Sequence, residues 1–182
     1  AIPLDDRGHP ILAYSACLTE QGVIFGGRNR IYRYDYDSRS IKLLLDFSSD
    51  PYFAISAISR WDEETLLCCS RWQGLRLINL RSGERRLPPF DCGKEIMALL
   101  IDSHNRIWLA PYNEGLRCFN PEGRLLASYT TDNSGLSNNV VLSMAERDSH
   151  IWVGTDGGGI NIIHPDSHRI TVLEHIPGDN YS

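Results

Sequence analysis

Seven polar and aromatic residues lie in short segments that each separate two apolar runs of the chain. They are Arg28, Arg71, Trp72, Gln73, Tyr112, Asn113 and Asp156. Aromatic rings stack on the apolar face of a sugar, while guanidinium and amide groups bind its hydroxyl or acidic groups. The set is suited to noncovalent recognition of a small polar ligand. Packing of Trp72 and Tyr112 against neighbouring strands is the alternative interpretation.

A catalytic site would need an acid, a base or a nucleophile that converge on one point. The six histidines fall mostly in turn-like segments: His9, His104, His150, His164, His168 and His175. The glycine-rich segment 156–159 lacks the Gly-Lys-Ser/Thr of a phosphate loop and the repeated pattern of a calcium loop. A hairpin tip that needs positive φ explains it better. We therefore predict no catalytic residue, no metal site and no cofactor.

The five cysteines match no zinc signature, because no C-x2-C pair and no nearby set of histidines is present. Four of them, Cys17, Cys68, Cys69 and Cys118, fall within apolar runs, where a free cysteine packs like a small hydrophobic residue. Cys92 lies outside such a run. Adjacent strand residues point to opposite faces, so a bond between Cys68 and Cys69 is not expected. We predict packing cysteines, although this use is less typical of an oxidising compartment.

The apolar runs belong to a repeat. Its second run starts at Val23, Leu66, Ile107 and Ile151, a spacing of about 43, 41 and 44 residues, as in the four-stranded blade of a β-propeller. A third run then opens in each copy, and turns rich in Ser, Asp, Glu and Gly precede the fourth. Short runs of β-branched and aromatic residues cut by such turns predict antiparallel strands.

Burial explains the repeat. The second run is apolar on both alternating faces, which predicts a sheet covered on both sides by neighbouring sheets. Blades stacked around an axis provide that cover. We predict an all-β fold, a β-propeller with four blade-like four-stranded antiparallel repeats at about 13–47, 54–90, 95–129 and 139–174. Residues 1–182 would form a single propeller segment, with Trp108 and Trp152 in the core.

The predicted propeller indicates where the seven polar and aromatic residues described at the start would lie. Connections between second and third strands, and linkers between repeats, lie at one end of the blades, so these residues would share that end. The linker residues Tyr52, Phe53, Asn138 and Asn139 would join them, with both aromatic rings exposed.

The segment GLSNNVVLSMAERDSHIWVGTDGGGINIIHP, residues 135–165, is similar to the repeat of the two-component regulator propellers. The third repeat resembles it less closely, and the first two depart further, with Ile24 or Leu67 where the family has an aromatic residue. The resemblance implies the periplasmic sensor region of a hybrid histidine kinase–response regulator. It also implies propellers of about seven blades followed by a β-sandwich, a membrane helix and the kinase. The chain would then be a fragment of a larger propeller.

Charge and composition limit the kinds of partner that the protein is expected to bind. The net charge of −5 argues against nucleic acid. No apolar run approaches the length of a membrane span. An open arc of four blades would expose an apolar face at each end. We therefore expect self-association through the end blades, or cover from the remaining blades of the parent protein; closure as a four-bladed ring is the third possibility.

These observations and the resemblance lead to one functional expectation. The chain would be a non-enzymatic, ligand-sensing propeller segment of a periplasmic two-component receptor in the inner membrane, and the parent would carry the histidine kinase. Its ligand would be an oligosaccharide, whose binding signals across the membrane. The alternatives are a propeller lyase with a divalent metal and a protein-interaction scaffold.

Overall fold

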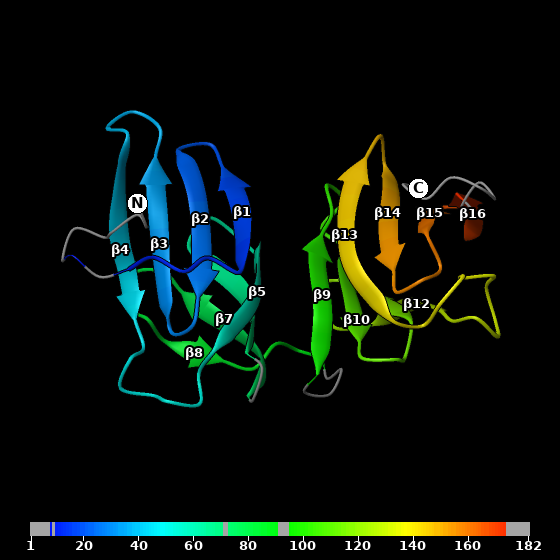
Figure 1. Ribbon diagram of the computed structural model, residues 1–182, viewed down its shortest axis with the longest axis horizontal. Coiled ribbons are helices and arrows are strands. Elements are labelled where there is room, and N and C mark those ends of the chain that lie inside the picture. Colours follow the sequence, from blue (N-terminus) through cyan, green and yellow to red (C-terminus); the bar gives the residue numbers. More distant parts are fainter. Residues whose placement is uncertain (1–7, 9, 71–72, 91–94, 174–182) are drawn as a thin grey trace. The chain divides into compact units, whose positions relative to one another are not determined.

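The computed structural model describes residues 8, 10–70, 73–90 and 95–173. Within them every regular element is a β-strand, and the strands form four separate four-stranded antiparallel sheets (Figure 1). The prediction of an all-β propeller fold with four blades is confirmed. In the described part of the chain no helix is long and apolar enough to cross a membrane.

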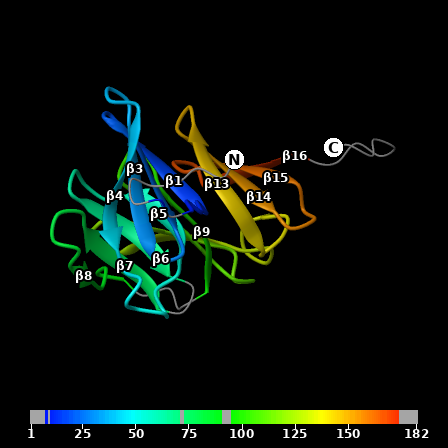
Figure 2. The same ribbon diagram turned by 60° about the vertical axis from the view of Figure 1, so that its left-hand side comes forward.

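The chain divides into two compact units, residues 1–95 and 96–182. The first unit holds blades 1 and 2. Their strands are β1 (Ser15–Thr19), β2 (Gly22–Gly27), β3 (Arg30–Asp35), β4 (Ser40–Asp46), β5 (Ile55–Arg60), β6 (Thr65–Ser70), β7 (Gly74–Asn79) and β8 (Arg85–Arg86). Strand β5 of blade 2 packs against β1 and β2 of blade 1, and Figure 2 shows β5 beside β1.

The second unit holds blades 3 and 4. Their strands are β9 (Ile96–Ile101), β10 (Ile107–Pro111), β11 (Leu116–Phe119), β12 (Leu125–Tyr129), β13 (Val141–Arg147), β14 (His150–Thr155), β15 (Ile160–His164) and β16 (Arg169–Leu173). Strand β13 packs against β9. The prediction that residues 1–182 form a single segment stays a prediction.

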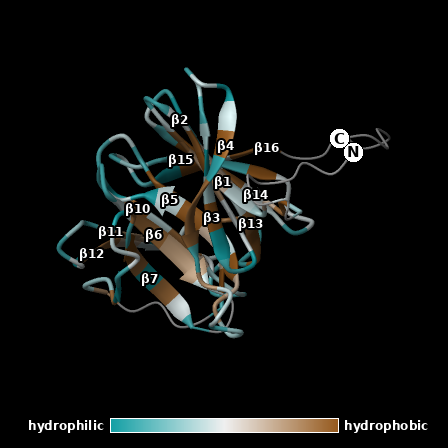
Figure 3. Ribbon diagram, turned by 90° about the vertical axis from the view of Figure 1, so that its left-hand side faces the viewer, coloured by the Kyte–Doolittle hydropathy of each residue, from teal (hydrophilic) through white to brown (hydrophobic). Residues whose placement is uncertain are grey.

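Each blade pairs its strands in chain order, so its connections alternate between two ends. We call the end with the first-to-second and third-to-fourth connections the hairpin end. The connector end holds the second-to-third connections and the linkers between blades. Apolar residues gather in the strands, whereas polar residues fill the turns (Figure 3). This division leaves two separate sets of polar loops where function can reside.

Burial of the second strands drives the stacking of blades. All residues of β6 and β10 are buried, as predicted from their two apolar faces. In the first unit a core of Ile24, Ile31, Phe53, Ile55, Ile58, Leu66, Cys68 and Ile78 joins blades 1 and 2. Full burial of one such large side chain contributes about 1.5–3 kcal/mol. The blades of a unit are therefore held together chiefly by apolar contact.

Two predictions of burial were wrong. Phe53 is 1% exposed, because its ring packs edge-on against Phe47 at 4.9 Å and belongs to the core of the first unit. Trp152 is only half-buried, because β14 alternates between buried and half-buried positions. The prediction for Trp108 is confirmed, since its side chain is fully buried.

Cys17, Cys68 and Cys118 are free thiols, and Cys68 and Cys69 are fully buried. Burial raises the pKa of the Cys118 thiol to about 12, which keeps it protonated at neutral pH. The packing role predicted for them is confirmed. Cys92 lies outside the described residues.

Candidate ligand-binding face

The connector end holds the residues that the sequence singled out. Arg28, Tyr112, Asn113 and Asp156 all lie between a second and a third strand, and all are exposed. Arg28 and Asn113 adopt positive φ, 49° and 57°, where the chain reverses. Tyr112 is 54% exposed, so its ring does not pack into the core. Arg71 and Trp72 lie outside the described residues.

The amide of Gln73 is already engaged. Its Nε2 donates to both carboxylate oxygens of Asp50, at 3.3 and 3.1 Å, and Arg85 Nη1 donates to Oδ2 of the same group at 2.8 Å. The hydrogen bonds from Arg85 and Gln73 lower the pKa of Asp50 below its usual value. Arg85 also lies over the ring of Phe53, 4.8 Å from its centroid. Gln73 thus anchors the linker between blades 1 and 2.

In the second unit, the linker between blades 3 and 4 is hydrogen-bonded to both second-to-third connections, the one between β10 and β11 and the one between β14 and β15. The carbonyl of Asn139 accepts a hydrogen bond from Gly115 N at 3.0 Å, and its side-chain Oδ1 accepts one from Thr131 N at 2.9 Å. Asn138 Nδ2 donates to the carbonyl of Asp156 at 2.6 Å. The two asparagines expected to join the ligand site therefore fix the loops that carry Tyr112 and Asp156.

Ser137 completes this linker. Its backbone N–H donates to Asn161 Oδ1 at 3.0 Å, and Asn161 Nδ2 donates back to Ser137 Oγ at 2.7 Å. Asn161 is fully buried, so this reciprocal pair satisfies a polar group that would otherwise be costly. The Ser-Asn-Asn motif is therefore a structural connector. It holds an exposed tyrosine, asparagine and aspartate on ordered loops.

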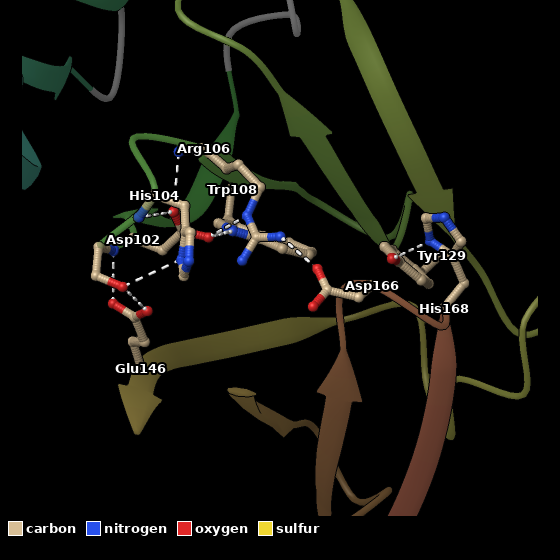
Figure 4. A network of polar contacts seen from close by, with 9 residues as sticks. Asp102, His104, Arg106, Trp108, Tyr129, Glu146, Asp166 and His168 are labelled. Carbon is tan, nitrogen blue, oxygen red and sulfur yellow. Dashed lines mark hydrogen bonds and ion pairs between the residues drawn. The ribbon is translucent and has the colours of Figure 1, made fainter. Parts of the chain in front are cut away.

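The hairpin end of the second unit contains a polar network that the sequence interpretation missed (Figure 4). Asp102 Oδ1 accepts hydrogen bonds from the backbone N–H groups of His104 and Arg106, both at 2.9 Å. Its Oδ2 accepts from Arg106 Nε at 2.6 Å and from Trp108 Nε1 at 2.8 Å. The side chain of Asp102 is fully buried. A carboxylate with four donors is a structural group, not a free base.

The network joins blade 3 to blade 4. Glu146 of β13 accepts hydrogen bonds from Ser103 N at 2.7 Å and from Ser103 Oγ at 2.5 Å. Arg106 Nη1 lies 3.6 Å from Asp166 Oδ1 in the turn before β16 (Figure 4). Ser103 and Glu146 are separated by one blade repeat, and this period is the only sequence signal that could have linked them.

A second contact between blades 3 and 4 involves Tyr129 of β12 and His168 in the turn before β16. The ring of Tyr129 stacks on Trp108 with centroids 5.9 Å apart, and its hydroxyl lies 2.9 Å from His168 Nδ1. Burial raises the pKa of Tyr129 to about 12, and the nearby Cys118 adds to the shift. The phenol is therefore un-ionised at neutral pH and can donate to the imidazole. Among the described residues, no group of three or more His, Cys, Asp or Glu side chains could hold a metal ion.

The solved structures most useful for comparison share the propeller fold. The chain is similar to the extracellular domain of the putative hybrid two component system BT4673 from B. thetaiotaomicron. The TM-score is 0.73 at 18% identity, over 98% of this chain and 24% of that domain. The corresponding BT3049 domain gives 0.63 at 12% identity, over 90% and 24%. The computationally designed Ika4 protein gives 0.58 at 14% identity, over 85% and 92%.

The chain therefore spans about a quarter of the length of the two bacterial domains. No curated protein matches the sequence. A family model described as two component regulator propeller matches residues 135–157. The matched residues, which include β13 and β14 of blade 4, are thus similar to a two component regulator propeller, and the resemblance stated from the sequence is confirmed. The matched segment includes the Ser-Asn-Asn connector that orders the loops of the second unit.

Proposed function

We propose that the chain is a ligand-sensing propeller segment of an extracytoplasmic two-component receptor, placed in the periplasm by a membrane-anchored parent. The observation that carries the proposal is the similarity of residues 135–157 to a two component regulator propeller, together with the fold shared with extracellular domains of such systems. Ligand binding shifts the receptor between two arrangements and so biases the histidine kinase of the parent.

The proposed ligand is an oligosaccharide, bound at the connector end. Tyr112 supplies an exposed ring for stacking, and Asn113 and Asp156 supply hydrogen-bonding groups on loops fixed by the Ser-Asn-Asn linker. Ordered loops lose little conformational entropy on binding, which favours affinity. Arg28, Arg71 and Trp72 are proposed as ligand contacts at the connector end of the first unit, considered by itself. Gln73, held by Asp50, would position its loop and offer its carbonyl.

The chain itself is proposed to be non-enzymatic. A propeller lyase would need a His/Glu pair beside a divalent metal. The four described histidines of the second unit instead lie at the hairpin end, away from the proposed ligand-binding loops: His104, His150, His164 and His168. A protein-interaction scaffold is the other alternative, and it would show no saturable binding of a small molecule.

The test compares Tyr112→Ala with Tyr36→Ala, which removes an exposed tyrosine (47%) at the hairpin end. Titration with short neutral and acidic oligosaccharides should show saturable binding that Tyr112→Ala weakens roughly tenfold, about 1.4 kcal/mol. Tyr36→Ala should leave binding unchanged. Equal loss in both variants, or no saturable binding by the unmodified protein, would contradict the proposal.

We also propose self-association, on the expectation that the four blades are part of a larger propeller. An isolated arc of blades leaves apolar sheet faces that another copy, or the remaining blades of the parent, would cover. Sedimentation equilibrium of the chain should therefore give a defined dimer. A strictly monomeric mass with a cooperative melt would contradict self-association and leave the sensing proposal standing.

A further inference from the structure

A cavity of about 380 Å³ lies between blades 1 and 2 of the first unit. Its lining comes from the β1–β2 and β5–β6 turns and from the residues after β7, so it is at the hairpin end of the first unit. Ile24, Leu44 and Leu80 provide its apolar part and belong to, or pack against, the core of this unit. Its volume falls within the range of about 300–1,000 Å³ that is usual for small-ligand sites.

Arg33 lines this cavity with a buried donor. Its Cα pairs with that of Ile24 across β2 and β3, so both side chains leave the same face of blade 1. Arg33 Nη1 donates to Gln21 Oε1 at a long 3.4 Å. Its Nε is buried and has no hydrogen-bond partner among the described residues. A buried donor without a partner costs about 1–3 kcal/mol, so this group calls for an explanation.

A second guanidinium reaches the same cavity. Arg60 ends β5, is half-buried, and its Nε lies 3.4 Å from the carbonyl of Asp62. Its charge acts on Cys17, whose Cα pairs with that of Ile24. Burial raises the pKa of the Cys17 thiol to about 11, and Arg60 opposes part of that shift.

The acidic residues of the cavity lie on exposed turns. Glu20 follows β1, and Glu63 and Glu64 belong to the β5–β6 turn. Glu64 pairs with Arg81 at 2.5 Å, an ion pair whose side chains are 48% and 81% exposed. The cavity is thus lined by half-buried arginines and by exposed glutamates, and this mixture of charges suits a ligand that carries both charges.

We propose that this cavity binds a small zwitterion, such as an amino acid. The ligand carboxylate accepts hydrogen bonds from the guanidinium of Arg33 and interacts with the charge of Arg60. A guanidinium offers Nε and Nη donors in the planar geometry that a carboxylate matches. The carbon chain contacts Ile24, Leu44 and Leu80, and the ammonium group lies near Glu20 and Glu63.

The probes are 4-aminobutyrate and succinate, which share a four-carbon chain and one carboxylate but carry an ammonium or a second carboxylate at the other end. Amide chemical shifts of the unmodified chain should saturate with 4-aminobutyrate at a Kd of roughly 1 mM or tighter. The shifted amides should lie in the β1–β2 and β5–β6 turns. Succinate should bind at least tenfold more weakly, because its second carboxylate meets the glutamates.

The variants are Arg33→Gln, Arg33→Lys and the control Arg30→Gln. Arg30 lies on the same strand, but its Nε pairs with Asp46 at 3.2 Å and it does not line the cavity. Arg33→Gln should weaken 4-aminobutyrate binding more than tenfold. Arg33→Lys, which keeps the charge but loses the planar donors, should weaken it less, and Arg30→Gln should not change it.

Three results would overturn the proposal: no saturable shift with 4-aminobutyrate, succinate binding at least as tightly, or equal loss in Arg30→Gln and Arg33→Gln. Amide spectra without ligand show whether each variant keeps the fold. This site is separate from the connector end. Neither outcome therefore decides the oligosaccharide proposal, which is tested by Tyr112→Ala.

Discussion

The carboxylate of Asp102 accepts a hydrogen bond from the indole Nε1 of Trp108 at 2.8 Å, and both side chains are fully buried. This contact crosses the turn between β9 and β10 and holds the largest core residue of blade 3 to its hairpin end. The neighbouring Ser103 then donates to Glu146 of blade 4. The buried carboxylate of Asp102 thus fixes the turn between β9 and β10, through which blades 3 and 4 contact each other.

Removal of this carboxylate should destabilise the second unit strongly. Asp102→Ala leaves Trp108 Nε1 and the Arg106 guanidinium without their acceptor, and the loss of one partner of a buried ion pair typically costs about 3–5 kcal/mol. Denaturant unfolding measures the change. Asp166→Ala is the matched control, because its side chain is fully exposed and lies 3.6 Å from Arg106; it should leave stability nearly unchanged. Similar effects of both substitutions would contradict the role given to Asp102.

The contact between blades 3 and 4 should be weakened by Glu146→Gln. Its carboxylate accepts from Ser103 N and Oγ, and a neutral amide accepts more weakly and offers only one oxygen. We expect a loss of about 1 kcal/mol in the free energy of unfolding. Hydrogen exchange should speed up at Ser103 N. Unchanged protection of this amide would show that the contact does not join the blades.

Substitution by alanine should destabilise the protein to different extents at two glycines of the connector end. Gly115 has φ 75°, and a Cβ there would lie 2.2 Å from the backbone oxygen of Tyr129. Gly157 has φ 71°, but a Cβ there would meet nothing within 4 Å. Gly157→Ala should therefore cost only the strain of the left-handed conformation, about 1–2 kcal/mol. Gly115→Ala should cost clearly more, because two strands must separate.

Thermal melts of both variants measure this difference. Equal destabilisation would mean that the close approach of Gly115 to Tyr129 relaxes without cost.

The stability of the second unit should fall as the pH drops below neutrality, in part through His164. Partial burial, and then the charges of His150 and Arg169, lower the pKa of His164. The unfolded chain therefore takes up this proton first, near pH 6.5. Stability is fully present above that pH and is lost as the pH falls from about 6.5 to the lower folded-state pKa.

His164→Gln should reduce this loss when unfolding is followed between about pH 7.5 and 5.5. The two proteins should show the same pH dependence above neutrality. An unchanged slope below pH 6.5 would remove His164 as its cause.

The fold could be predicted because short-range pattern and burial act together. The second strands β2, β6, β10 and β14 start within one residue of the predicted positions, because each blade needs the repeat to bury its faces. Trp108 was correctly placed in the core, since a strand apolar on both faces must be covered. Trp152 was wrongly placed in the core, because the burial of a strand in blade 4 depends on the blades that cover it and not on the sequence of the strand alone.

The site was harder to predict because it depends on side chains that are far apart in the sequence. Gln73 looked like a free amide, but Asp50 lies 23 positions earlier and holds it. Ser103 and Glu146 meet across 43 positions. The cavity at Arg33 could not be foreseen either, since no local pattern shows that its Nε is buried between two blades. Such contacts are set by the packing of blades, which the repeat alone does not specify.

The most direct test of the sensing account is an amide chemical-shift titration of the chain with short neutral and acidic oligosaccharides. The account predicts saturable shifts at the connector end, around Tyr112 and Asn113 and around Asp156, without shifts at the hairpin-end residues Asp102 and Glu146. Shifts confined to the hairpin end, or none with any oligosaccharide, would contradict it.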